Sequence, residues 1–482
     1  MILALILAAA TSVHLAVTTA SPQAQASFDR GLFLYYAFDR DGAAAAFETA
    51  AGEDPHLAMA YWGVALADGP DLNNPLTSDR FERAKAAIER AGALERNVTP
   101  HERAYIDAMA LRYRGTWNDW QRDDDAYRRA MEKLAAASGD ENAKLLTAEA
   151  LLEHGGMLWN GARPATDDSR TILASIASVL AADPSNPMAN HLCIHAYDYA
   201  PDRSPALPCA QRLDAAAFPP HAEHLAHVPA HYWTETGEYG KAVASSERAY
   251  QLLLRWDALA HRPLTAQRYA SHDVTVGYAA AMMLGNYQDA LTWSARMDAF
   301  FPWKYESLTA LRFARYDLAF EAPATGIFEQ IVRGLAALHL GRLDAARSAA
   351  REIEKESAGT PKGYLAELFM ARLTEAQGKT RAARSWLQQA QDTQHAQYGA
   401  ELIPEIPAEE ALGGFLLRAH DADAAVTAFQ ACLDAYPNDP RALFGLAAAL
   451  QAQGHAADAA QTRTHFMQLW KGADTTLTID DF

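Results

Sequence analysis

The chain has 482 residues, of which 50% are hydrophobic, and its formal net charge is −18. This length suffices for several domains or one long repeat array, and the apolar content excludes an intrinsically disordered chain. The acidic balance argues against nucleic acid as a partner, because phosphate binding needs a basic surface, and it also argues against docking on an anionic membrane.

The N-terminal segment has features of a secretory signal peptide. Its first 17 residues are mostly apolar, a small and polar stretch follows, and Ala24-Gln25-Ala26 matches an A-x-A cleavage site. The usual basic start is missing, since no Lys or Arg precedes Arg30, and an uncleaved anchor is the alternative. We predict a signal peptide over 1–26, export to the periplasm or the extracellular space, and no stable membrane span after cleavage.

The rest of the chain predicts helices almost throughout. Ala-rich segments of helical periodicity alternate with short breaks that contain Gly, Asn or Pro. They fit a 34-residue helix–turn–helix template with a small residue at position 8, Ala at 20, a large apolar residue at 24, Ala at 27 and Pro at 32. Two copies fit without a gap, with Cys in place of Ala in the second: Gly31, Ala43, Phe47, Ala50, Pro55; and Gly413, Ala425, Phe429, Cys432, Pro437. Weaker copies, separated by insertions, centre on Ala242, Ala290, Ala346 and Ala383.

The region 191–231 is rich in histidine, with six of the 17 histidines of the chain. His191 and His195 are spaced i, i+4, so they lie on one face of a helix. The same holds for the i, i+3, i+7 series of His224, His227 and His231. Imidazoles on one helical face are a usual way for a helix to offer nitrogen ligands to a transition metal.

Two of the three cysteines lie in the same region. Cys193 and Cys209 flank a turn at 201–205, and on two antiparallel helices they would lie at similar heights. A disulfide between them is one interpretation, and two separate buried thiols are the other.

The 34-residue template resembles the tetratricopeptide-repeat (TPR) superfamily over most of residues 27–470. The resemblance implies an all-α fold, a TPR-like α-solenoid of helix–turn–helix repeats that is irregular in the middle, with first helices lining a concave groove. We expect N-terminal repeats over 27–120, central repeats with the histidine cluster over 121–320 and C-terminal repeats over 321–482.

In that family, positions 2, 5, 9 and 12 of the first helix face the groove. Taking Ala206, Ala242 and Ala290 as position 20 of three successive repeats places six histidines and one aspartate at such positions. These residues are His191, His195, Asp198, His224, His227, His231 and His272. Neighbouring first helices lie about 8–10 Å apart, so the register pairs His195 with His231, His191 with His227, and His224 with His272.

Two blocks also resemble a narrower group of bacterial TPR proteins, with the patterns Asn-His-x-x-Ile-His and His-x-x-His-x-Pro-x-His. Here the blocks run from Asn190 to His195 and from His224 to His231. Where that group has Glu after the first block, this chain has Asp198, which is one methylene shorter. Pro229 should kink the helix of the second block, because it cannot donate a backbone hydrogen bond. The resemblance supports a site and not a reaction.

These observations predict an exported metalloprotein that binds copper, or as second choice zinc, through three or more histidines in the groove. Asp198, Glu235 and Asn190 are expected to contact and orient the ligands, or to act as a base. The sequence leaves open whether the ion performs chemistry, as in a copper- or zinc-dependent enzyme. The alternative is an exported scaffold that binds a peptide or protein partner in the groove without metal. Phosphate-binding loops, the hydrolase G-x-S-x-G pattern and His-Glu-x-x-His are absent from the sequence.

Overall fold

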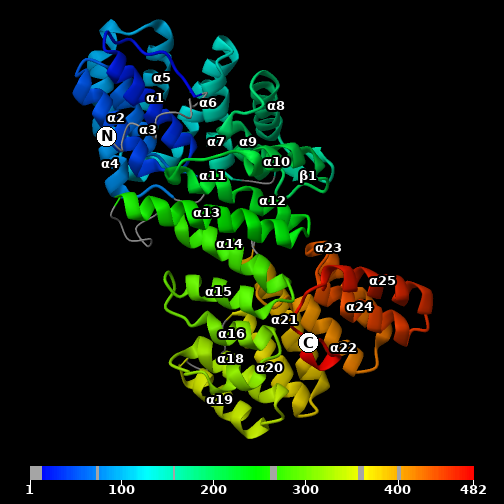
Figure 1. Ribbon diagram of the computed structural model, residues 1–482. Coiled ribbons are helices and arrows are strands. Elements are labelled where there is room, and N and C mark those ends of the chain that lie inside the picture. Colours follow the sequence, from blue (N-terminus) through cyan, green and yellow to red (C-terminus); the bar gives the residue numbers. More distant parts are fainter. Residues whose placement is uncertain (1–12, 72–74, 156–157, 261–268, 357–362, 399–402) are drawn as a thin grey trace. The chain divides into compact units, whose positions relative to one another are not determined.

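The computed structural model describes residues 13–71, 75–155, 158–260, 269–356, 363–398 and 403–482. The described chain is almost entirely α-helical (Figure 1), which confirms the predicted fold class. Its two strands, β1 (Trp159–Asn160) and β2 (Arg163–Pro164), form a short antiparallel pair. Among the described helices, none combines the length and apolarity that a membrane span requires.

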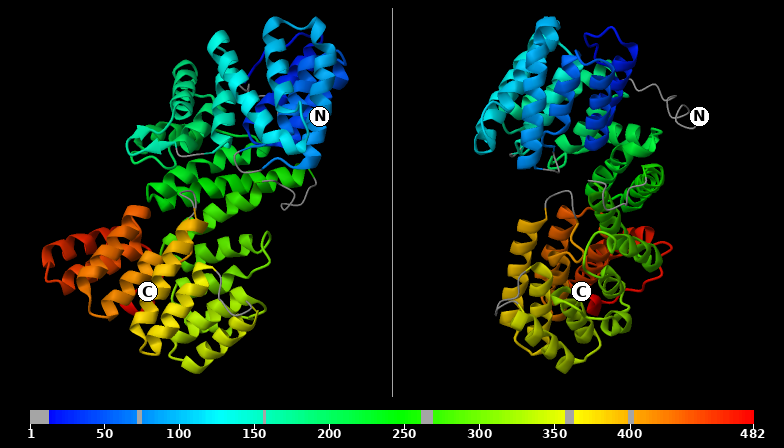
Figure 2. Two further views of the ribbon diagram at one scale, coloured as in Figure 1. Left: turned by 180° about the vertical axis from the view of Figure 1, so that it is seen from behind. Right: turned by 90° about the vertical axis from the view of Figure 1, so that its left-hand side faces the viewer.

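The chain divides into two compact units, each described here by itself. The first comprises residues 1–229 and 251–261, and the second comprises 230–250 and 262–482. Figure 2 shows the helices from two further directions. Helices up to the unit boundary are α1 (Pro22–Tyr36), α2 (Arg40–Glu53), α3 (Ala58–Ala67), α4 (Ser78–Leu94), α5 (Pro100–Arg112), α6 (Trp120–Ser138), α7 (Glu141–Glu153), α8 (Asp167–Ala182), α9 (Pro187–Ala196), α10 (Leu207–Ala215) and α11 (Glu223–His227).

The remaining helices begin at the residue that follows Val228. They are α12 (Pro229–Glu235), α13 (Tyr239–Ala260), α14 (Ala270–Met283), α15 (Tyr287–Met297), α16 (Tyr305–Arg312), α17 (Tyr316–Glu321), α18 (Ile327–His339), α19 (Leu343–Glu356), α20 (Tyr364–Ala376), α21 (Thr380–Gln397), α22 (Ala408–Arg418), α23 (Ala422–Ala435), α24 (Pro440–Ala452) and α25 (Ala456–Leu469).

The ring of Phe47 shows how the repeat template packs. It lies against Gly31 in α1 and Gly63 in α3, where a Cβ atom would come within 2.7 Å and 2.4 Å of the ring. Phe429 packs in the same way against Gly413 and Gly445. A glycine at these positions therefore lets the large side chain at position 24 reach the backbone of two first helices.

Six alanines at position 20 lie in the second helix of their repeats, whereas Ala206 belongs to the 3-10 helix Ser204–Ala206 that precedes α10. All six are buried without exposed surface, because this position faces the first helix of the same pair. The six are Ala43, Ala242, Ala290, Ala346, Ala383 and Ala425. The repeats of the middle are irregular, as predicted, since α9, α10, α16 and α17 have only 10, 9, 8 and 6 residues.

Candidate metal centre

Helix α9 carries the first two histidines of the predicted site. It begins at Pro187, after Asn186, whose side chain accepts a hydrogen bond from the Ala189 amide at 3.0 Å. Every residue of α9 is buried, including His191 and His195. Both imidazoles are therefore fixed by packing on a helix that is covered on all sides.

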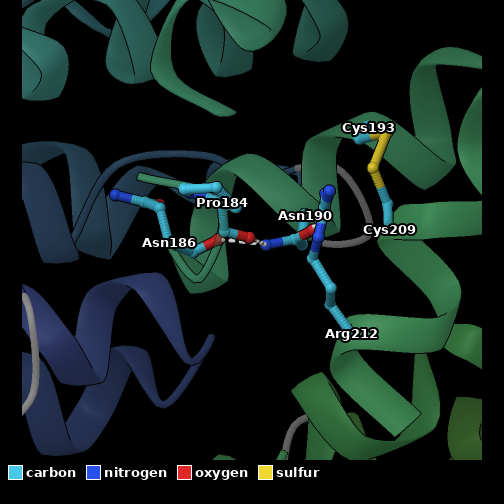
Figure 3. The surroundings of a disulfide bond; sticks show 6 residues. All are labelled: Pro184, Asn186, Asn190, Cys193, Cys209 and Arg212. Atoms are coloured by element: carbon cyan, nitrogen blue, oxygen red, sulfur yellow. Dashed lines mark hydrogen bonds between the residues drawn. A yellow bond between two sulfur atoms is a disulfide. The ribbon is translucent and has the colours of Figure 1, made fainter. Parts of the chain in front are cut away.

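Asn190 stabilises the start of this helix. Its Nδ2 donates to the backbone oxygens of Pro184 and Asn186, at 2.9 and 2.8 Å, and its Oδ1 accepts from Arg212 at 3.4 Å (Figure 3). These contacts anchor the first turn of α9. A contact between Asn190 and a metal ligand stays a prediction.

A disulfide joins Cys193 of α9 to Cys209 of α10, with 6.4 Å between the two Cα atoms (Figure 3). Of the two interpretations that the sequence left open, the structure has the disulfide. The bond ties the histidine-bearing helix to its partner helix, and a closed loop of about 15 residues typically contributes about 3 kcal/mol to stability.

Asp198 lies against His195, as its place in the register predicts. The Nδ1 atom of His195 and the Oδ2 atom of Asp198 are 2.8 Å apart, and both side chains are buried. With the proton on Nδ1 and the carboxylate as acceptor, the Nε2 atom presents its lone pair. Histidines that bind metals are commonly oriented by such a carboxylate.

Histidines from α9 and α11 meet in the first unit. The ring centroid of His191 lies 4.7 Å from that of His195 and 5.5 Å from that of His224. The ring of His224 in turn lies 5.7 Å from that of His227. Both helical faces singled out by their spacing are therefore brought together.

Phe38 covers this cluster and was not anticipated from the sequence. Its ring lies 4.2 Å from the ring of His191 and 5.0 Å from that of His224. It occupies the connection between α1 and α2 with a φ of 66°, a conformation that is uncommon for a large side chain. No feature of the repeat template indicates such a residue, since the template specifies helix contacts and not the direction of a connecting side chain.

Pro229 divides the second histidine block. Helix α11 ends at His227, and α12 begins at Pro229, which confirms the predicted break. The backbone N–H of Val228 still bonds the oxygen of His224 at 3.0 Å, so the interruption is confined to one position.

His231 and His272 lie side by side in the second unit. Their Nε2 atoms are 3.1 Å apart, and their rings are nearly parallel, with centroids separated by 5.1 Å. Together with His227, each offers one nitrogen, and the three nitrogens lie within 4.8 Å of one another. Two nitrogens bound to one zinc ion are about 3–3.5 Å apart, given bonds of about 2.0–2.1 Å.

The histidines were predicted to line an open groove, and the structure shows most of them to be buried. His191, His224, His227 and His231 have no exposed surface, and His195 is only 8% exposed, whereas His272 is half-buried. These five histidines are thus enclosed and do not line an open groove, because they lie on short helices whose residues are packed on every side. A contact of His272 with His231 was not predicted by the register, and the predicted pairing of His272 with His224 stays a prediction.

Carboxylates accompany the histidines. Glu235, at the end of α12, is 7% exposed, and Asp273 follows His272 in α14. Burial raises the pKa of Asp273 to about 7, and the neighbouring His272 opposes this shift. The predicted contact of Glu235 with the ligands stays a prediction.

Comparisons with known proteins concern the fold. Among protein-family models, none matches the chain. A search of curated proteins gives no match. Solved structures similar to the chain include the human IFIT1 dimer with m7Gppp-AAAA, at 12% identity and a TM-score of 0.34 over 94% of this chain and 92% of that chain. Yeast Tom70 is 12% identical with a TM-score of 0.30, covering 95% of this chain and 93% of that one.

The P58(IPK) TPR domain is similar at 14% identity and a TM-score of 0.23, over 90% of this chain and 99% of that chain. At these values the comparisons carry no conclusion about function. The helix pairs and the glycine–phenylalanine contacts of the chain itself show the fold. They are those of a TPR-like α-solenoid.

Proposed function

We propose that this protein is a metalloprotein in which His227, His231 and His272 bind one transition-metal ion. The observation that carries the proposal is the triad itself, three imidazole nitrogens within 4.8 Å of one another. Three protein ligands leave a fourth position for water or a small molecule, as in catalytic zinc sites. The same arrangement would serve an ion that is merely held, so the reaction is left open.

The nature of the donors suggests which metals to test. Imidazole nitrogens suit copper and zinc, whereas calcium and magnesium prefer oxygen. We place copper first and zinc second, because export is proposed on the N-terminal sequence. The neighbouring cluster of His191, His195 and His224 extends the supply of nitrogen ligands and is proposed as the place of a second ion. The contact of Asp198 with His195 supports this extension.

Metal analysis of the purified full chain tests the proposal. We expect about one or two equivalents of copper or zinc per chain. His272→Ala should lower the content by about one equivalent, because three ligands are the usual minimum for such a site. The matched control is His465→Ala, which removes an exposed histidine of α25. Wild-type protein without either metal, and without uptake when the metals are added, would contradict the proposal.

A second function follows from the fold. Helical repeat solenoids present extended surfaces, and the TPR-like fold suggests a protein-interaction scaffold. If the chain holds no metal, this scaffold function remains as the proposal, with a peptide or protein as the partner. Metal content therefore separates the two functions directly.

A further inference from the structure

We infer that the second unit contains a peptide-binding site whose resident ligand is the chain's own segment 477–482. The segment lies beside α22, where Figure 1 draws it in red. Its side chains alternate between buried and exposed positions from Thr475 to Thr478, and Phe482 is buried again. The segment is extended up to Thr478 and then forms a short 3-10 helix, Ile479–Asp481, so it lies on the surface as a strand-like stretch followed by one turn. The inference is independent of the metal proposal.

Three arginines from three different repeats hold the backbone of this segment. Arg418 donates to the oxygens of Ile479 and Phe482, at 3.0 and 2.9 Å. Arg441 donates to the oxygen of Asp481 at 2.7 Å, and Arg372 to that of Asp480 at 3.2 Å. Hydrogen bonds from charged donors to backbone oxygens do not depend on the side chains of the bound segment. The arginines can therefore hold another peptide of the same conformation.

The surroundings of Phe482 make the site specific for an aromatic side chain at this position of the peptide. The ring of Phe482 lies 5.7 Å from that of Phe429 and 6.1 Å from that of Phe444, and Arg441 stands 5.1 Å above it. Below it is Gly414, where a Cβ atom would come within 2.2 Å of the Cβ atom of Phe482. Glycine within a helix costs about 1 kcal/mol relative to alanine. Its presence here is explained by the room that an aromatic side chain needs.

An acidic side chain is recognised next to this aromatic pocket. The Tyr316 hydroxyl donates to the Asp481 carboxylate, and this tyrosine stacks on His339 with 4.2 Å between ring centroids. The site thus fits a peptide with an acidic residue followed by an aromatic one. Asp480, which precedes the recognised acidic residue, is exposed, so the site places less restriction on the side chain at that position.

The segment does not fill the available space. A cavity of about 50 Å³ adjoins it and is lined by Leu335, Leu368 and Phe415. Arg372 and Arg441 line the same cavity. A peptide from a partner protein with larger aliphatic residues before the acidic one would use this space. Such a peptide would replace the resident segment, since both need the same arginines.

The path before residue 477 makes this exchange feasible. Asp474 anchors the chain by accepting from the Tyr287 amide at 3.0 Å and by donating its own amide to the Gly285 oxygen at 3.0 Å. Arg315 also donates to the Asp474 oxygen at 3.0 Å. The anchor is formed by Gly285, Tyr287 and Arg315, whereas the three arginines that hold the backbone of residues 479–482 lie on α20, α22 and α24. Residues 477–482 can leave the site while the anchor at Asp474 holds.

The test measures binding of a fluorescent peptide with the sequence Leu-Thr-Ile-Asp-Asp-Phe to the full chain by anisotropy. Phe482→Ala weakens the resident segment, so this variant should bind the peptide at least about tenfold more tightly than wild type. Adding Arg418→Met should reverse the gain by about tenfold or more, as expected for lost charge-assisted hydrogen bonds. His465→Ala, which removes an exposed side chain of α25, should behave as wild type.

A folded Phe482→Ala chain that leaves the peptide unbound would overturn the inference. If that variant fails to fold, hydrogen exchange of the wild-type chain provides the decision. Excess peptide should then accelerate exchange in residues 477–482 and leave α20 and α22 unchanged. Unchanged exchange in 477–482 would show that the segment is a permanent part of the core and would equally overturn the inference.

Discussion

His221 differs from the neighbouring histidines in its surroundings. It lies in a short 3-10 helix, Pro220–Ala222, and packs against the rings of Phe33 and Trp256, with centroids 6.0 and 5.4 Å away. Burial, with a smaller contribution from Arg30, lowers its pKa to about 4. His221 is therefore a neutral core residue at neutral pH.

This pKa predicts an acid-sensitive first unit. The unfolded chain takes up a proton at about pH 6.5, whereas the folded chain does so only near pH 4, so stability falls as the pH drops through this window. Within this window the free energy of unfolding falls by about 1.4 kcal/mol per pH unit, and by about 3 kcal/mol in total. His221→Phe keeps a ring in place and should remove this part of the pH dependence. Urea unfolding of both proteins at pH 7, 6 and 5 measures it, and parallel pH profiles would contradict it.

Residue spacing predicted part of the site. The place of Asp198 three residues after His195 indicated that it lies near the ligands, and their contact is local, since Asp198 belongs to the turn that follows α9. The contact between His231 and His272 depends on how separate helices cross. The repeat register did not predict this contact, since Pro229 interrupts the first helix and α13, with 22 residues, is longer than the 14-residue α2 and α23. The interruption at Pro229 and the longer α13 each shift the positions along neighbouring helices at which side chains come into contact.

At the level of helices, the template makes a prediction about glycine. Gly63→Ala in α3 would place a Cβ atom 2.4 Å from the Phe47 ring, and such overpacking typically costs about 1–3 kcal/mol. Gly52→Ala in α2 is the matched control, because no atom lies within 4 Å of its added Cβ. It should stabilise the helix by up to about 1 kcal/mol.

Thermal unfolding of the two variants measures the difference. We expect a lower midpoint for Gly63→Ala and an unchanged or higher one for Gly52→Ala. Adding Phe47→Leu to Gly63→Ala should recover part of the loss, since the smaller side chain makes room. Equal midpoints for both single variants would show that the glycine–phenylalanine contact is not what requires glycine in α3.

At the scale of the whole molecule, the predicted export depends on residues 1–26. Residues before the predicted cleavage point take part in the first unit: Thr18 donates to Glu102 through its amide at 2.6 Å, and Gln25 accepts from the Val17 amide at 3.0 Å. Cleavage after Ala26 would remove these contacts together with the first turn of α1. A signal peptidase acts on the chain during export, before such contacts form, so cleavage stays a prediction of the sequence.

The three cysteines provide a test of the compartment that is independent of the N-terminus. A disulfide persists in an oxidising compartment, and glutathione and thioredoxin keep most thiols reduced in the cytosol. If the protein is exported, its denatured chain should show one free thiol, that of the buried Cys432, and three after reduction. Cys432→Ser, as the control, should show none before reduction. These numbers are measured by isolating the protein from its native cells without reductant, alkylating it at once and determining its mass by mass spectrometry. The same spectrum should show that the chain begins at Ser27. Three thiols before reduction, on a chain that retains residues 1–26, would contradict export and remove the reason for placing copper before zinc.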